Sequence, residues 1–260
     1  MSKRTILILG VLVLLGLVSG LFTGPIEKAL GIPQAMQQAQ GNPKINMPAA
    51  NPPGAMPADN NQPNQPTNIL ATDTFQRQNQ PSWGIASDGR QWGGDINKPS
   101  FSITNLKGQI AGGQGALEAI IGLPADNVEV TISGSINQFG NNVNLGIVLR
   151  WTSPNNWYKA FIDGNQLVIL KSVNGQNSRI AQVDMKTNAG VAYTLRFRSL
   201  GTVLSAKVWP SATAEPQKWL VVDDHTFPTG QFGVRVLEQP TTVITITSFS
   251  ATTAAIGNKI

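Results

Sequence analysis

The sequence contains no cysteine. Disulfide bridges, zinc–thiolate sites, cysteine nucleophiles and lipidated cysteines are therefore excluded as sources of stability or function. Histidine occurs once in 260 residues, and charged residues make up only 13% of the chain. Between residues 69 and 251, no 12-residue stretch carries the apolar period of a helix, so a helical or α/β domain is not predicted.

The net charge of +5 gives little reason to expect a nucleic-acid partner. Within the first 33 residues, Lys3, Arg4 and Lys28 stand against Glu27 alone. The rest of the chain has nearly equal numbers of basic and acidic residues, so its high isoelectric point is not the signature of a DNA- or RNA-binding surface.

A long uncharged segment follows the first two basic residues. It runs from Thr5 to Ile26, and as a helix rising about 1.5 Å per residue it would span a hydrocarbon core of about 30 Å. Lys3 and Arg4 place its start in the cytoplasm, which predicts a single-pass signal-anchor over residues 1–32 with the C-terminal domain outside the cell membrane. The alternative is a signal peptide cleaved near the small residues at 18–20, which would give a secreted protein.

Residues 33–68 have a different composition, rich in Pro, Asn and Gln. Eight of the 17 prolines lie between Pro33 and Pro66, and apolar periodicity is lost. Such a segment cannot bury enough apolar surface to offset its ordering entropy, so we expect a disordered linker. Proline would extend it as a spacer. A disordered segment with no role of its own is the alternative.

Short apolar-alternating segments, separated by Gly and Asn turns, occupy the chain from Ile69 onward. They predict an all-β domain over residues 69–252, built as a two-sheet antiparallel jelly-roll sandwich, followed by a tail over residues 253–260. The thirteen strands expected cover residues 72–77, 100–104, 115–121, 128–136, 145–151, 157–162, 166–173, 179–184, 192–199, 203–209, 219–222, 231–237 and 243–251.

Several fragments in this domain follow one another in a familiar order. They are Asp73-Thr-Phe-Gln-Arg77, Trp83-Gly84, Gly146-Ile-Val-Leu-Arg-Trp151, Asn155-Asn-Trp-Tyr158, Tyr193-Thr-Leu-Arg-Phe197 and Gly230-Gln-Phe-Gly233. Together they resemble the concanavalin A-like lectin/glucanase superfamily, in particular its laminin-G-like and carbohydrate-binding modules of bacterial surface proteins. The resemblance implies a jelly roll that binds glycans on its concave face or rim loops.

The same resemblance implies a calcium ion in some members. Asp73, at the start of the domain, is the ligand expected if that site exists here, because calcium takes carboxylate and carbonyl oxygens. The last strand departs from the family pattern, since Ser248 stands where relatives often have an aspartate before the phenylalanine. We therefore expect no obligatory cofactor, with calcium at Asp73 as the alternative.

The acidic residues do not form a hydrolase pattern. A retaining glycosidase needs two carboxylates about 5 to 5.5 Å apart, as laminarinase-type members provide with a Glu-x-Asp-x-x-Glu strand. Here the corresponding strand offers Glu129 alone, with Thr131 and Ser133 at the following positions of the same face. Glu118, on the preceding strand, could approach Glu129 only by cross-strand pairing. A non-catalytic module is predicted, with a divergent glycoside hydrolase as an alternative.

Strand alternation predicts which residues of the central hairpin, from Gly146 to Asp163, could meet a ligand. Leu149, Trp151 and Tyr158 are expected in the core, which turns Trp157 and Lys159 to the other face. An outward tryptophan beside turn amides suits sugar stacking, although it could instead cover the edge of the sandwich. The predicted contacts in this region are Arg150, Asn155, Asn156, Trp157 and Lys159.

Basic residues lie off the apolar alternation on several strands, and most acidic residues lie in turns. We hypothesise that some of these cations form one face that attracts an anionic glycan or cell-wall polymer, with Arg196 as a further contact. Solvated charges that prevent edge pairing are the alternative. The residues concerned are Arg150, Lys159, Lys171, Arg196, Arg198, Lys207 and Arg235.

The sequence thus predicts a membrane-tethered, extracytoplasmic, lectin-like module that binds carbohydrate without transforming it. The alternatives are an adhesive module that binds protein and a divergent glycoside hydrolase.

Overall fold

The computed structural model describes residues 68–140 and 142–255. Every regular element in this part of the chain is a β-strand, which confirms the all-β prediction for the folded domain. Over these residues there is no helix with the length and apolar character needed to cross a membrane. The predicted signal-anchor, nearly all of the predicted linker and the last part of the tail lie outside the described residues.

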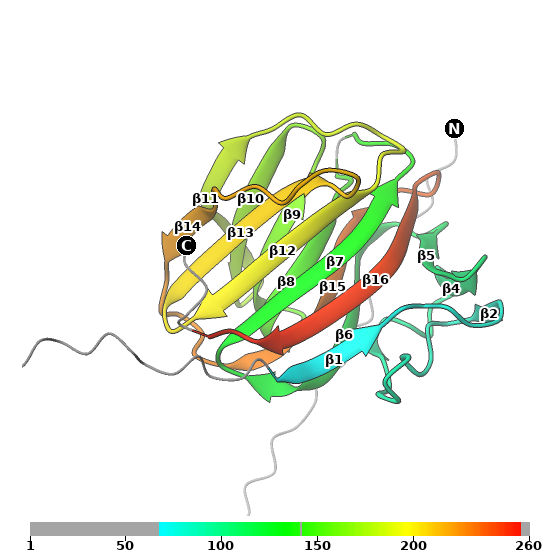
Figure 1. Ribbon diagram of the computed structural model, residues 1–260, viewed down its shortest axis with the longest axis horizontal. Coiled ribbons are helices and arrows are strands. Elements are labelled where there is room, and N and C mark those ends of the chain that lie inside the picture. Colours follow the sequence, from blue (N-terminus) through cyan, green and yellow to red (C-terminus); the bar gives the residue numbers. More distant parts are fainter. Residues whose placement is uncertain (1–67, 141, 256–260) are drawn as a thin grey trace, which may run out of the picture. The chain divides into compact units, whose positions relative to one another are not determined.

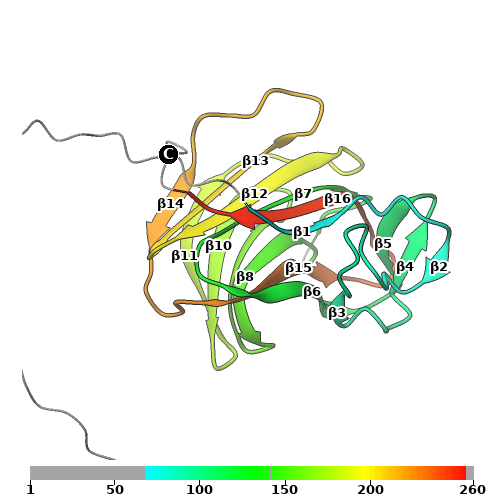
Figure 2. The same cartoon turned by 60° about the horizontal axis from the view of Figure 1, so that its bottom comes forward.

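The strands form two antiparallel sheets packed face to face (Figure 1; Figure 2). One sheet has nine strands: β1 (Ile69–Asp73), β2 (Gln80–Pro81), β4 (Phe101–Thr104), β5 (Lys107–Ala111), β7 (Val128–Ile136), β12 (Tyr193–Leu200), β13 (Val203–Pro210), β14 (Leu220–Asp223) and β16 (Val243–Thr253). Their order is β14-β13-β12-β7-β16-β5-β4-β2, and β1 also pairs with β16.

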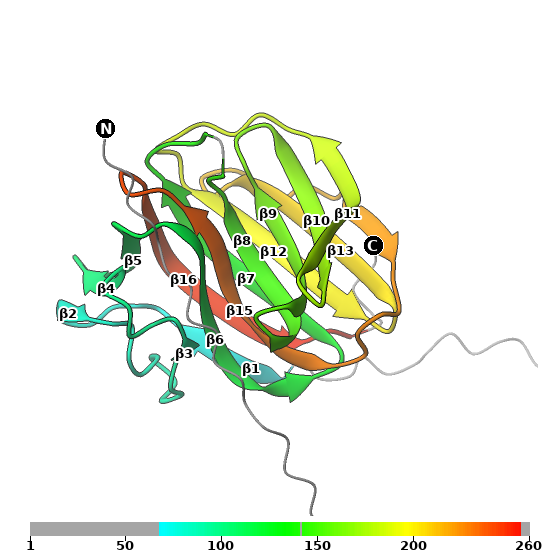
Figure 3. The same ribbon diagram turned by 180° about the vertical axis from the view of Figure 1, so that it is seen from behind.

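The second sheet has seven strands and faces the viewer in Figure 3. They are β3 (Gly93–Gly94), β6 (Gly115–Ala125), β8 (Leu145–Ser153), β9 (Asn156–Ile162), β10 (Gln166–Val173), β11 (Gln176–Asp184) and β15 (Gly230–Glu238). Their order is β11-β10-β9-β8-β15-β6-β3. The chain changes sheet between β6 and β7 and again between β7 and β8, as expected of a jelly roll.

The core lies between the sheets and follows the predicted alternation. In β7, at the middle of the nine-stranded sheet, buried and partly exposed residues alternate from end to end. Leu195 and Phe197 of β12 are fully buried on the same side. Across the core, β8 and β9 supply Leu145, Ile147, Leu149, Tyr158, Ala160 and Ile162, all fully buried.

A bulge near the end of β8 breaks this alternation. Gln231 of β15 pairs with Trp151 and Gly233 pairs with Val148, so three steps along β8 match two along β15. Arg150 takes the extra position with a φ of 49°. Trp151 consequently packs with Val148 and Trp157 on the outer face of the seven-stranded sheet, and the expectation that Trp151 lies in the core is wrong.

An aromatic cluster fills the end of the sandwich near β2 to β5. Its rings contact each other edge-on or stacked at centroid distances of 4.9 to 6.1 Å. Gly108 belongs to β5, a strand that the sequence did not predict, and a Cβ there would lie 2.8 Å from the Phe75 ring. The clustered rings are therefore buried in the interior and do not contact ligands at the rim of the sandwich. They belong to Phe75, Trp83, Trp92, Phe101 and Phe249.

Candidate functional site

A cavity of about 670 Å³ opens where β8 begins and β9 ends. Its volume lies in the range of small-molecule sites, roughly 300–1,000 Å³. Three loops surround it, namely those that join β7 to β8, β9 to β10 and β11 to β12. The jelly-roll topology brings these loops together because the strands that they join end at the same end of the sandwich.

Aromatic rings and amide side chains line this cavity. Rings can pack against the apolar C–H faces of a sugar, and amides can donate to and accept from its hydroxyls. Arg179 of β11 and Lys186 of the following loop add two cations. The rings are Phe139 and Phe161, and the amides are Asn142, Asn144, Asn165 and Asn188.

Asn144 is the most firmly positioned of these amides. Its backbone exchanges hydrogen bonds of 3.1 and 3.3 Å with Leu237 of β15. Its Oδ1 accepts 2.5 Å and 3.0 Å hydrogen bonds from Nζ of Lys159 and the backbone N–H of Leu237. Because Oδ1 is occupied, a hydrogen bond from this side chain to a ligand would have to come from the amide NH₂.

Lys159, a predicted contact, reaches the site through Asn144. The residue is 3% exposed, and its Nζ lies 5.1 Å from the centroid of the Phe161 ring. Burial lowers the pKa of Lys159 well below its usual range; nearby Arg235 lowers it further, while Glu118 opposes the shift. Lys159 thus lies behind the cavity wall and orients an amide.

Trp157 occupies the predicted outer face but is covered there. The guanidinium of Arg235 lies 4.5 Å from its ring centroid, and the residue is 3% exposed. Its Nε1 donates a 2.8 Å hydrogen bond to the backbone oxygen of Pro154. Arg235 also pairs with Glu118, whose pKa is raised by burial although Arg235 opposes the rise. The structure therefore assigns Trp157 to the packed layer on this face.

Asn155 and Asn156 lie in the turn at the opposite end of β9 from the cavity. The Asn156 side chain donates to Oγ of Ser153 at 3.1 Å and accepts from the backbone N–H of Asn174 at 2.8 Å. The backbone oxygen of Asn155 accepts from Gly175 at 2.9 Å. These contacts join the hairpin to its neighbour, and only the Asn155 side chain is exposed.

Arg150 is buried between turns at that same end of the sandwich. Its guanidinium donates to the backbone oxygens of Phe227 at 2.7 Å, Asp126 at 3.1 Å and Gly201. Only 3% of the residue is exposed, and burial lowers its pKa. Arg150 is therefore placed to hold three turns together, away from the cavity.

Arg196 lies on the outer face of the other sheet. Its Nη1 is 2.8 Å from Oε1 of Glu215, and its Nε donates to Oγ1 of Thr131 at 3.2 Å. Arg150, Trp157 and Arg196 thus do not share a surface. Lys159 and Arg235 lie on one outer face and Arg196, Arg198 and Lys207 on the opposite one, so the strand cations divide between the two sheets.

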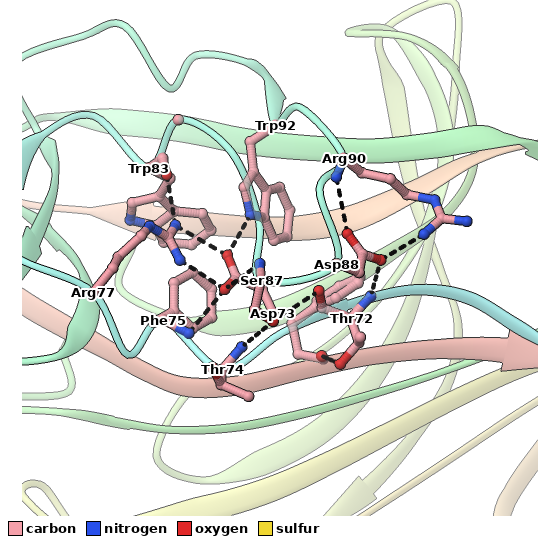
Figure 4. Close-up of polar contacts among 12 residues, drawn as sticks. Thr72, Asp73, Thr74, Phe75, Arg77, Trp83, Ser87, Asp88, Arg90 and Trp92 are labelled. Atoms are coloured by element: carbon pink, nitrogen blue, oxygen red, sulfur yellow. Dashed lines mark hydrogen bonds and ion pairs between the residues drawn. The ribbon is translucent and has the colours of Figure 1, made fainter.

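Asp73 is fully buried in a network of N–H donors (Figure 4). Its Oδ1 accepts from the backbone N–H groups of Phe75 at 2.8 Å and Ser87 at 3.3 Å. Trp92 Nε1 donates to Oδ2 at 2.8 Å, and the Arg77 guanidinium contacts both oxygens.

This donor set does not suit calcium, which needs oxygen ligands around it. In residues 68–140 and 142–255, no group of three or more His, Cys, Asp or Glu could hold a metal ion. The geometry therefore argues against the predicted calcium ligand and gives Asp73 a structural role.

The carboxylates considered for catalysis are held apart by the fold. Glu118 lies on β6 and Glu129 on β7, which belong to different sheets. The cross-strand approach considered from the sequence therefore does not occur. Glu129 pairs with Arg198, and Glu118 pairs with Arg235.

Sequence reasoning missed most of the cavity. Arg179, Lys186 and Asn188 come from an exposed edge strand and a loop, where neither alternation nor a motif marks them. The available signal was the density of Asn and Gly in the loops before β8, after β9 and after β11. Only the strand order shows that these loops meet.

Comparison with known proteins gives structural similarity without sequence similarity. No family model matches the chain, and no curated protein matches it. The Ca²⁺-bound exoplasmic/lumenal domain of VIP36 superposes with a TM-score of 0.52 at 11% identity, over 68% of this chain and 90% of that one. This likeness confirms the predicted two-sheet jelly-roll fold.

A bacterial enzyme shows the same architecture. A xylan β-1,4-xylosidase from Bacillus halodurans C-125 gives a TM-score of 0.53 at 12% identity, over 69% of this chain, which spans 38% of the xylosidase. The carbohydrate-binding module CBM66 from Bacillus subtilis gives 0.49 at 17% identity, over 60% of this chain and 94% of the module. At 11% and 12% identity, the likeness to VIP36 and to the xylosidase establishes the fold alone.

Proposed function

We propose that this protein is a non-catalytic glycan-binding module held at the outer side of the cell membrane. The observation that carries the proposal is the cavity at the start of β8, whose lining includes both Phe161 and the pre-positioned amide of Asn144. An apolar ring together with a fixed hydrogen-bond donor can recognise both the apolar C–H face and the hydroxyl groups of a sugar.

A relative in fold provides support. The VIP36 exoplasmic/lumenal domain with bound Ca²⁺ and Man3GlcNAc superposes on this chain with a TM-score of 0.50 at 11% identity, over 68% of this chain and 93% of that one. The same architecture therefore holds an oligosaccharide in that protein, and we extend carbohydrate binding to this chain.

The placement of the acidic residues supports a non-catalytic role. Glu118 and Glu129 lie on different sheets and are each paired with an arginine. Asp163 is the only carboxylate in the cavity lining, and a glycosidase of the common type needs two. Release of reducing sugar from any oligosaccharide bound in this cavity would contradict this part of the proposal and favour a divergent hydrolase.

The membrane part of the proposal is supported by the sequence. The uncharged run from Thr5 to Ile26 has the length of a membrane span, and residues 33–68 have the composition of a spacer. Full-length protein should co-sediment with membranes and resist carbonate extraction. Recovery of a shortened protein from the medium would show cleavage instead.

A glycan array with the full-length chain tests the binding site. The protein is solubilised in a detergent without a sugar headgroup, because a sugar headgroup would compete for the cavity. Asn165→Ala and Asn188→Ala remove exposed amides from the lining and should each weaken binding about three- to tenfold, in line with a lost hydrogen bond.

The matched control is Asn155→Ala, which removes an exposed amide at the other end of β9 and should leave binding unchanged. Loss of binding in Asn155→Ala, with no effect of Asn165→Ala or Asn188→Ala, would move the site to the hairpin turn. An array without any bound glycan would overturn the proposed function.

A further inference from the structure

Most cations in the described part of the chain are neutralised by neighbouring carboxylates. Arg77, Arg196, Arg198, Lys207 and Arg235 each pair with an aspartate or glutamate. Within residues 68–140 and 142–255, the lysines and arginines without such an ion pair are Lys107, Arg150, Lys159, Arg179, Lys186 and Lys218.

Two of these cations meet at the cavity. Arg150 and Lys159 are buried and use backbone or amide oxygens as partners. Arg179 and Lys186, by contrast, are exposed, and both line the cavity although they come from different elements. Their convergence produces a local excess of positive charge beside the rings and amides.

The hydrogen bonds of Arg179 leave much of its guanidinium available. Nη1 donates to the side-chain oxygens of Gln166 at 2.7 Å and Gln182 at 3.3 Å, which orients the group without neutralising it. A guanidinium has five N–H donors in a planar fork that matches a carboxylate. Arg179 is thus oriented, charged and supplied with further donors.

Asp163 reduces the charge of the lining but does not pair with either cation. Its Oδ1 accepts hydrogen bonds of 3.0 and 2.9 Å from the backbone N–H groups of Asn165 and Gln166, which hold the turn between β9 and β10. The lining therefore has two cations and one anion, and the anion is used for the turn.

We infer that the cavity selects glycans that bear a carboxylate, with Arg179 and Lys186 as the carboxylate-binding residues and Phe161 and Asn144 contacting the sugar ring. This inference rests on the proposed function, and it names the ligand class: chains that contain uronic acid. Binding neutralises the excess charge of the lining, and each cation adds a contact that a neutral sugar lacks.

The test compares uronate oligosaccharides with their methyl esters, which keep the backbone and lose the charge. Galacturonate, glucuronate and mannuronate oligomers are titrated into the full-length protein by calorimetry at 50 and 500 mM NaCl. At least one acid should bind about tenfold more tightly than its ester at low salt, and this advantage should shrink at high salt.

Charge-removing variants locate the effect. Arg179→Gln and Lys186→Gln should each weaken binding of the acid about fivefold and leave binding of the ester unchanged. Lys107→Gln is the matched control, because Lys107 is exposed, lacks an ion pair among the described residues and lies on β5 of the other sheet.

Equal affinity for acid and ester would overturn the inference and leave the proposed function intact, as would binding of neutral glycans alone. An acid preference that Lys107→Gln removes as strongly as Arg179→Gln would also overturn it, because the charge effect would then be nonspecific. Absence of binding to every glycan would overturn the proposed function and the inference with it.

Discussion

The Nζ of Lys159 lies 2.5 Å from Oδ1 of Asn144, so a buried lysine on the outer face of a sheet fixes an amide in the wall of the cavity. The described residues place no carboxylate in an ion pair with this lysine. Burial of an amine without a counter-ion costs stability, so the fold holds the Asn144 amide in place at a cost.

Lys159→Met tests this cost. Methionine keeps the apolar stem and removes the amine, so the free energy of unfolding at pH 7 should rise by about 1–2 kcal/mol. The pKa of Lys159 is lower in the folded protein than in the unfolded chain, where it is about 10.4. Between these two pKa values the unfolded chain holds a proton that the folded protein has lost, so the free energy of unfolding of the wild type increases as the pH rises. Urea titrations should therefore show the two proteins converging toward pH 10. Parallel pH profiles would argue against a lowered pKa.

Arg150→Ala should lower the free energy of unfolding by about 3 kcal/mol without changing glycan affinity. The substitution leaves the carbonyls of Asp126, Gly201 and Phe227 without their guanidinium donor. Denaturant unfolding and the glycan titration are measured on the same preparation. A stable Arg150→Ala protein that no longer binds glycan would restore Arg150 as a ligand contact.

Asp73→Asn should be destabilising by about 3 kcal/mol, because a neutral amide cannot accept from five N–H donors and leaves Arg77 without its counter-ion. Calcium should not change the melting temperature of the wild type relative to EDTA. A calcium-dependent rise in melting temperature that Asp73→Asn abolishes would revive the calcium site.

Asp224→Asn should cost about 2 kcal/mol at pH 7. Burial opposes ionisation of Asp224, but hydrogen bonds from Lys171, Thr226 and Tyr158 outweigh it and hold the pKa of Asp224 far below its usual range. The unfolded carboxylate protonates near pH 3.9, so this stabilisation is complete above that pH and is lost as the pH falls toward the folded pKa. The difference between variant and wild type should narrow below about pH 4 in thermal unfolding curves.

The sequence predicts the layers of this fold well because burial in a sandwich follows a period of two. The alternation in the central hairpin identified the core residues Leu149 and Tyr158, which are both fully buried. The bulge at Arg150 has no such signal, since neither arginine nor its neighbours require a left-handed backbone. The predicted alternation between core and outer face therefore failed over the last residues of β8, beginning at Arg150.

The site was less predictable for a different reason. A strand residue reveals its face through its neighbours in sequence, whereas Arg179 and Lys186 become neighbours of Asn144 only through the order of strands in the sheet. Outward-facing Trp157 and Lys159 were assigned to the correct face, yet their accessibility depends on Arg235 and Asn144, which lie elsewhere in the sequence.

The hydrogen bonds of the Arg150 guanidinium connect the turns at one end of the sandwich, and the cavity loops lie at the other end. Substitutions in the cavity loops therefore leave those hydrogen bonds intact. The lining of the cavity can thus change without loss of the contacts that stabilise the other end of the fold. The same separation makes the domain a scaffold for library design, in which the loops before β8, after β9 and after β11 are randomised while the Arg150 end is kept constant.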